Sequence, residues 1–178
     1  QKAIDALSGK DEPRTMGLAH RQKGRAFANA GQFKNAIVEY QLAAKSFEED
    51  VESVLQAQVL LSIGQLLLAG RQPQEAKDEL KKAIEILKAE KETQLLIECM
   101  IALGAAEADS ANYSAAINLH GEASKLAVSQ NNLRGQYLAA SEEGFDLLLQ
   151  GKTENALDRF LDANKLINKS ATATDRER

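Results

Sequence analysis

The side chains that could do chemistry are few and lie far apart in the sequence. The only two histidines are His20 and His120, and Cys99 is the only cysteine, so neither an internal disulfide nor a cysteine-rich metal site can form. No Gly-rich loop follows an expected strand, and acidic runs such as 48–50 and 142–143 are typical of solvated helix faces. We therefore expect no catalytic residue, no metal ion and no cofactor, and we predict that the chain is not an enzyme.

His20, His120 and Cys99 all fall where an apolar helix face would be buried. Each histidine occupies a core-type position, so we interpret both as partly buried side chains with satisfied hydrogen bonds. Cys99 has no nearby histidine to activate it, so we expect a buried structural thiol rather than a nucleophile.

Two cations, Arg21 and Arg25, stand one helical turn apart and could act together. A pair of guanidinium groups at this spacing can hold an acidic side chain through bidentate hydrogen bonds. The alternative is that both are ordinary solvated surface residues, and the sequence leaves this choice open.

The elements that carry these residues repeat with a step of 40 residues. A period between about 20 and 50 residues is typical of arrays of stacked helical units. Residues of the same type recur at this step and form columns, one of which is glycine. Glycine is tolerated inside a helix there because a Cβ atom would prevent close approach of the second helix of the pair. Four columns recur in register: Gly24, Gly64, Gly104 and Gly144; Ala36, Ala76, Ala116 and Ala156; Tyr40, Leu80, His120 and Phe160; and Ala43, Ala83, Ala123 and Ala163.

Amphipathic spacing and break residues define eight long helices in four pairs. Residues 1–12 are expected to form a short helix or linker, and residues 169–178 a disordered polar tail. The four repeats span about 13–50, 51–90, 91–130 and 131–168. Their helices are expected at about 13–30 and 33–49, 51–69 and from 73, 92–109 and 113–129, and 132–150 and 153–168.

Composition agrees with an all-helical chain. The 178 residues are 44% hydrophobic but only 4% aromatic, and the sequence holds two prolines and no tryptophan. The net charge of −4 argues against nucleic acid as a partner, although residues 1–36 are locally basic. No apolar run is long enough to insert into a membrane. We expect a cytoplasmic location, and because the chain opens on Gln1 we expect it to be part of a longer protein.

The column pattern resembles the tetratricopeptide repeat (TPR). The match covers about residues 17–168, and repeat three departs from it through Glu107 and His120, and repeat four through Ala140 and Glu143. The 40-residue step resembles the lengthened repeats of kinesin light chains, of spindle-orientation adaptors and of soluble NSF attachment proteins. The residues that carry the resemblance are Gly24, Phe27, Gly31, Ala36, Tyr40 and Ala43; Leu60, Ile63, Gly64, Leu67, Ala76, Leu80 and Ala83; Met100, Leu103, Gly104, Ala116 and Ala123; and Gly144, Leu147, Gly151, Ala156, Phe160 and Ala163.

The resemblance implies an all-α, right-handed superhelix of four antiparallel helix pairs, in which the first helix of each pair lines a concave groove. The residues facing that groove would be basic at the start, then Gln and Leu, then apolar. A suitable ligand would be a peptide or helix with an acidic end and hydrophobic anchors. The implied groove residues are Leu18, Arg21, Arg25, Asn29, Gln58, Leu61, Gln65, Leu68, Glu98, Ile101, Ala105, Asp109, Leu138, Ser141, Phe145 and Leu149.

Chaperone-binding members of this family hold a C-terminal carboxylate with a clamp of cations and asparagines. The matching positions here are Arg21, Arg25, Ser62, Glu98 and Ala102. Glu98 would repel a carboxylate, which argues against that clamp.

The last helix carries an apolar stripe wider than one neighbour can cover. Leu161 stands where the other repeats have Gln41, Lys81 and Gly121. Because the ends of a helical array need polar caps, we expect this surface to pack on a further helix, a second copy in a homodimer, a partner, or the tail folding back.

The sequence therefore predicts a scaffold or adaptor that binds another protein. Two alternatives stay open: a regulatory domain gated by a peptide, and a trafficking adaptor resembling the soluble NSF attachment proteins.

Overall fold

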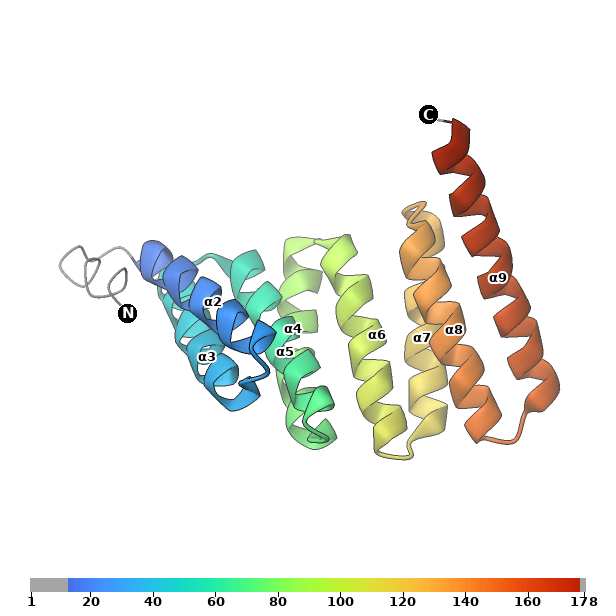
Figure 1. Cartoon of the computed structure of the whole chain (residues 1–178), viewed down its shortest axis with the longest axis horizontal. Helices are drawn as coiled ribbons and strands as arrows, with labels where there is room; N and C mark the ends of the chain where they lie inside the picture. The colour runs from blue at the N-terminus through green and yellow to red at the C-terminus, as the bar shows by residue number, and fades with distance from the viewer. Residues whose placement is uncertain (1–12, 177–178) are drawn as a thin grey trace. The chain divides into compact units, whose positions relative to one another are not determined.

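The computed structural model describes residues 13–176, and describes side chains as far as residue 167. The short helix or linker expected in residues 1–12 lies outside the described residues. The described part contains eight helices and no strand, which confirms the all-α prediction. In Figure 1 the helices follow one another as hairpins, and their bounds are α2 Pro13–Asn29, α3 Phe33–Glu49, α4 Ser53–Ala69, α5 Pro73–Glu90, α6 Thr93–Asp109, α7 Tyr113–Ser129, α8 Leu133–Leu149 and α9 Thr153–Arg176.

The chain divides into two compact units, Gln1–Glu92 and Thr93–Arg178. In the first unit α2 packs on α3, α3 on α4 and α4 on α5. In the second, each helix from α6 to α9 packs on the next, and α6 also contacts α8. Each unit thus holds two helix pairs with a buried layer of Ala, Leu and Ile between them.

The glycine column is the point of closest approach within each pair. A Cβ atom added to Gly64 would lie 2.6 Å from Cγ of Leu80, and one added to Gly24 would lie 2.7 Å from the Tyr40 ring. A Cβ atom added to Gly144 would lie at the same distance, 2.7 Å, from the Phe160 ring, and one added to Gly104 would overlap the His120 ring. In every pair the glycine therefore meets the residue sixteen positions later, which confirms the packing role predicted from the sequence.

The turns show a regularity that the sequence reading did not detect. A residue with positive φ occurs every twenty positions, and the following residue donates its N–H to the carbonyl five residues earlier, as Gln72 does to Leu67 at 2.9 Å. This is a Schellman turn, which satisfies carbonyls at the end of a helix. The sequence signals the glycine positions only, and at the second break Gly70 has φ −82° while Arg71 takes the left-handed conformation. The positive-φ residues are Gly31, Val51, Arg71, Lys91, Ala111, Asn131 and Gly151.

The last helix differs from the expectation of a disordered tail over 169–178. α9 continues as a helix to Arg176 rather than ending near Asn168. No glycine or proline follows Gly151 in the sequence, so nothing in the chain stops the helix at the predicted point.

The glycine column yields a matched stability test. Gly64→Ala should lower the free energy of unfolding by about 1–3 kcal/mol, because the new Cβ would overlap Leu80. Gly121, also inside a helix, has no atom within 4 Å of an added Cβ. Gly121→Ala should therefore raise stability by about 1 kcal/mol through helix propensity. Urea unfolding measures both changes, and a shift of the same sign for the two variants would contradict the packing role.

The turns yield a second test. Val51 has φ 58°, where a β-branched side chain is strained, and it is exposed. Val51→Gly should raise the free energy of unfolding by about 0.5–1 kcal/mol, after the larger entropy of the unfolded glycine chain is subtracted. The control is Val38→Gly, in the exposed middle of α3, which should lower stability. Thermal unfolding that shows no gain for Val51→Gly would contradict the strained turn.

Candidate binding surfaces

The first unit brings Arg21 of α2 beside α4, with Arg25 one turn further along α2. Nη1 of Arg21 donates a hydrogen bond to Oε1 of Gln58 at 3.1 Å, so two predicted groove residues from different repeats lie side by side. Arg21 is half-buried and Arg25 is exposed. The structure thus forms a surface, which we call the α2/α4 face, from residues that the sequence places 37 positions apart.

Tyr40 lies close enough to both arginines to interact with their charges, but it is a buried core residue, 6% exposed, as its column suggested. Its ring lies against Gly24 of α2. Burial raises the pKa of the Tyr40 phenol, and the positive charges of Arg25 and Arg21 oppose that rise without cancelling it. The phenol therefore stays protonated at neutral pH and can act as a hydrogen-bond donor. Its position sixteen residues after a column glycine could have indicated this contact.

Neither arginine is neutralised within the part of the chain that the structure describes. Arg21 and Arg25 form no ion pair with any carboxylate of residues 13–167, whereas the neighbouring cations of α2 do. Arg14 Nε lies 2.6 Å from Oε1 of Glu52, and Lys23 pairs with Glu39. The α2/α4 face therefore has two cations available to an acidic ligand, whereas the Tyr40 side chain is buried.

The other predicted groove residues of the first unit differ in how much surface they offer. Leu61 is 5% exposed and contributes almost nothing to the surface. Leu18, Gln58 and Leu68 are half-buried, while Asn29 and Gln65 are exposed.

The second unit presents the predicted apolar residues on α6 and α8. Phe145 and Leu149 are 55% and 61% exposed, so they are accessible as anchors. The Phe145 ring packs edge-on against Phe160, with 5.1 Å between centroids. The remaining predicted positions form the rest of what we call the α6/α8 face: Asp109 is exposed, and Glu98, Ile101, Ala105, Leu138 and Ser141 are half-buried.

His20 is a satisfied, mostly buried side chain, as predicted. Its Nδ1 lies 2.8 Å from Oε2 of Glu39, whose other oxygen pairs with Lys23. Burial acts to raise the pKa of the Glu39 carboxyl, but the hydrogen bonds from Lys23 and His20 outweigh it and leave the pKa below its usual value. The cluster joins α2 to α3 and leaves no free histidine for catalysis there.

His120 is fully buried and also satisfied. Nδ1 lies 2.7 Å from Oδ2 of Asp146 on α8, and Nε2 lies 3.1 Å from the Ile101 carbonyl on α6. Both ring nitrogens therefore have a hydrogen-bond partner inside the protein. The sequence predicted the buried histidine but missed Asp146, which looked like one more charge on a solvated helix.

Cys99 is buried, and burial together with the Glu98 carboxylate raises the pKa of its thiol to about 12. The prediction of a structural thiol is confirmed, since a thiolate is the reactive form. Among the described residues no group of three metal-ligating side chains occurs. No helix in residues 13–176 is long and apolar enough to cross a membrane.

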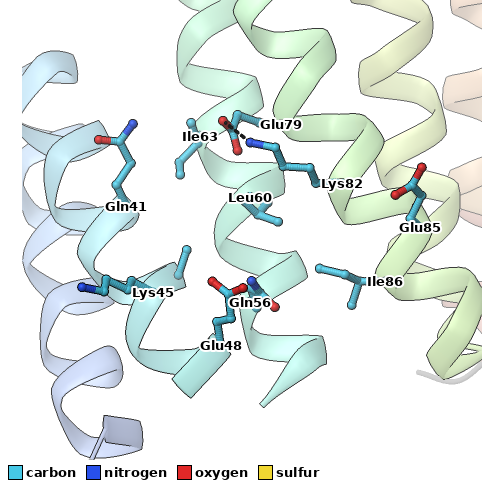
Figure 2. A pocket seen from close by; sticks show the side chains of 11 residues that line it. Gln41, Lys45, Glu48, Gln56, Leu60, Ile63, Glu79, Lys82, Glu85 and Ile86 are labelled. Atoms are coloured by element: carbon cyan, nitrogen blue, oxygen red, sulfur yellow. Dashed lines mark hydrogen bonds and ion pairs between the residues drawn. The ribbon is translucent and has the colours of Figure 1, made fainter. Parts of the chain in front are cut away.

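A cleft of about 590 Å³ opens on the other side of the first unit, between α3 and α5. Figure 2 shows Lys45 and Glu48 on one wall, Glu85 and Ile86 on the other, and Leu60 between them. Charges of both signs line it, and Nζ of Lys82 is paired with Oε1 of Glu79 at 3.0 Å. Sequence spacing alone does not group these side chains, because they come from three different helices.

The second unit has a corresponding cleft between α7 and α9, of about 430 Å³. Its floor carries Glu143, in the column of Ile63. Burial raises the pKa of the Glu143 carboxyl, against the opposing charges of Arg159, His120 and Lys125. Because neither cleft has a uniform charge or a buried unpaired polar group, the α2/α4 and α6/α8 faces are the better candidate surfaces.

No protein-family model matches the chain, and no curated protein matches it. Several solved structures, however, have a similar fold. The fold resembles aspartyl phosphate phosphatase F from Bacillus subtilis, with a TM-score of 0.85 and 17% identity over 96% of this chain and 45% of that one. It also resembles a putative kinesin light chain of nearly identical TPR-like repeats from Podospora anserina, with a TM-score of 0.79 and 14% identity over 96% of this chain and 83% of that one.

A third similar structure is a Rap protein complexed with competence and sporulation factor. The TM-score is 0.76 and the identity 14%, over 93% of this chain and 47% of that one. The chain therefore spans less than half the length of the phosphatase and of this Rap protein. At these identities the comparisons establish the fold, which is that of TPR-like helical repeats.

The buried pair yields a third prediction. His120→Leu should lower the free energy of unfolding by about 3–5 kcal/mol, because Asp146 loses its partner inside the protein. The double variant His120→Leu/Asp146→Ala restores the residue types found at the same positions of other repeats, Leu80 and Ala106. The double variant should lower the free energy of unfolding clearly less than His120→Leu alone. Guanidinium unfolding measures the cycle, and additive losses would show that the two side chains are not coupled.

Proposed function

We propose that the chain is a protein-interaction scaffold that binds a segment of another protein along the first helices of its repeats. The TPR-like fold supports this role, since such repeats present extended surfaces rather than enclosed catalytic pockets. We place the binding residues on the α2/α4 and α6/α8 faces. No catalytic step, nucleic acid or membrane insertion is part of the proposal, and the proposed location is the cytoplasm.

The observation that carries the proposal is the uncompensated positive charge of the α2/α4 face. Two guanidinium groups without a carboxylate partner in the described part of the chain suit a carboxylate or another anionic group of a ligand. Charge-assisted hydrogen bonds from arginine are about twice as strong as neutral ones. An acidic end of the partner segment would therefore bind near Arg21, Arg25 and Tyr40.

The α6/α8 face suits a different part of a ligand. Phe145 and Leu149 expose large apolar side chains, which act as anchors when a partner buries them. A peptide or helix with hydrophobic side chains suits this face, and an acidic segment suits the α2/α4 face. The carboxylate clamp of chaperone-binding relatives stays unsupported, because its matching positions include Glu98 and the buried Ala102.

One alternative gains support from the comparisons. A Rap protein has this fold and is complexed with competence and sporulation factor, which supports a regulator whose repeats bind a signalling factor. In that version the same faces bind the factor, and a further part of the protein responds. The trafficking-adaptor alternative would instead bind a coiled-coil bundle through charged outer faces.

Selection from a displayed library of random peptides tests the proposal. Enriched peptides should carry Asp or Glu near one end and apolar residues further along. Arg21→Gln/Arg25→Gln should weaken the selected peptides at least tenfold, about 1.4 kcal/mol, measured by fluorescence anisotropy. Salt should weaken binding to the parent more than to the variant.

The matched control removes two cations from the other side of the first unit. Lys45→Gln/Lys82→Gln changes the net charge equally but lies on α3 and α5, so it should leave affinity unchanged. Equal losses for the two double variants would mean that net charge, rather than the α2/α4 face, determines binding. Loss only in the lysine variant would favour the outer-face adaptor.

A further inference from the structure

The cleft between α7 and α9 carries a carboxylate where the other repeats have a buried aliphatic side chain. Glu143 of α8 lines this cleft and is in register with Ile63 and Leu103, which are 1% and 6% exposed. Glu143 is itself half-buried, and burial raises the pKa of its carboxyl. The carboxylate has therefore lost part of its hydration, which a partner of opposite charge would replace.

Repeat one shows how the fold can neutralise a charge at this position. Lys23 is in register with Glu143, and it pairs with Glu39, sixteen residues later. The residue sixteen positions after Glu143 is Arg159, so repeat four has the same two positions with the charges exchanged. Although the structure describes both side chains, Glu143 and Arg159 form no ion pair. Nη2 of Arg159 lies instead 3.7 Å from Oδ2 of Asp162, on its own helix.

The walls of the cleft offer space and two cations. Gly121 of α7 is in register with Gln41 of the first-unit cleft, and a Cβ atom added to Gly121 would meet no atom within 4 Å. Lys125 stands on the α7 wall and Arg159 on the α9 wall, and the exposed Glu122 also lines the α7 wall. The volume of about 430 Å³ lies within the range of small-molecule sites, roughly 300–1,000 Å³.

A ligand that carries both signs of charge matches this arrangement. A ligand ammonium beside Glu143 supplies the hydrogen bonds and the positive charge that the half-buried carboxylate lacks. A ligand carboxylate between the walls accepts charge-assisted hydrogen bonds from Arg159 or Lys125, which are stronger than neutral ones. A ligand with a single sign of charge would instead meet a group of its own sign in the same cleft.

We propose that the α7/α9 cleft is a second binding site, which takes a small zwitterion of the amino-acid or dipeptide class. Its ammonium binds Glu143, and its carboxylate binds Arg159 and Lys125. The missing side chain at Gly121 leaves room for the ligand between these groups. The site belongs to the second unit, so it does not depend on peptide binding at the α2/α4 face.

NMR titration of the isotopically labelled full chain at neutral pH and constant ionic strength tests the site. The zwitterionic probes are alanine and alanyl-alanine, whose comparison distinguishes the two ligand sizes. N-acetyl-alanyl-alanine lacks the ammonium, and alanyl-alanine amide lacks the carboxylate. Backbone signals around Gly121, Glu143 and Arg159 should shift and saturate with a zwitterion. Either blocked dipeptide should bind about tenfold more weakly, or less well still.

Two variants remove different parts of the site. Glu143→Gln removes the carboxylate charge at nearly constant volume, and Gly121→Gln restores the side chain found at Gln41 without changing any charge. Each should weaken the zwitterion about tenfold or more, and circular dichroism checks that both remain folded. The matched control is Glu85→Gln, which removes one exposed carboxylate from the first-unit cleft and should bind the zwitterion like the parent.

Three results would overturn the proposal. The first is the absence of a saturable shift with either zwitterion. The second is equal binding of alanyl-alanine and its amide, which would indicate a site for a basic side chain of a partner protein. The third is an equal loss in Glu143→Gln and Glu85→Gln, which would assign the effect to net charge rather than to the α7/α9 cleft.

Discussion

The structure depends on the close approach of two helices where a glycine in the first meets a large side chain in the second. Because glycine has no Cβ, the ring or branch of the residue sixteen positions later occupies that space, and the helix backbones approach one another. Everything else about each pair follows from this contact. The small alanine columns keep the second helix close over its length, and the turn of two or three residues must return the chain at a fixed distance.

Because each turn returns the chain at a fixed distance, the backbone pattern recurs every twenty residues, which is half of the 40-residue repeat. Helices α2 to α8 have seventeen residues, except α5 with eighteen, and each turn of two or three residues contains one left-handed residue. Five of these residues are not glycine, so the turn geometry is imposed by the packing of the flanking helices and not chosen by the local sequence. The same regularity makes the departure of α9 informative, since among the described helices only α9 continues past the position of the next turn, residue 171.

Much of the fold could be predicted from the sequence, because column residues report contacts that repeat. The helix pairs, the role of Gly24 and its counterparts, and the buried state of His120 and Cys99 all follow from period and spacing. What could not be predicted are contacts specific to one repeat. Asp146 looks like a solvated carboxylate until α8 is placed on α7, and the hydrogen bond from Arg21 to Gln58 joins residues 37 positions apart. Leu61 was expected on a surface that the structure buries, because helical periodicity gives a direction but not the depth of the neighbouring helix.

The structure also separates two kinds of surface by their chemistry. The α2/α4 face carries cations that no described carboxylate neutralises, although carboxylates pair with Arg14 and Lys23 on the same helix. The clefts on the other side carry both signs of charge, so they offer less discrimination between ligands. This contrast, rather than the fold alone, is the physical reason for assigning ligand binding to the first helices.

Chemical-shift mapping of the isotopically labelled chain with a selected acidic peptide tests that assignment most directly. The account predicts that backbone signals of α2 and α4 around Arg21, Arg25 and Gln58, together with the region of Tyr40 beneath them, shift as peptide is added. Signals lining the cleft between α3 and α5 should stay unchanged. Shifts concentrated in that cleft, with α2 and α4 unaffected, would contradict the account.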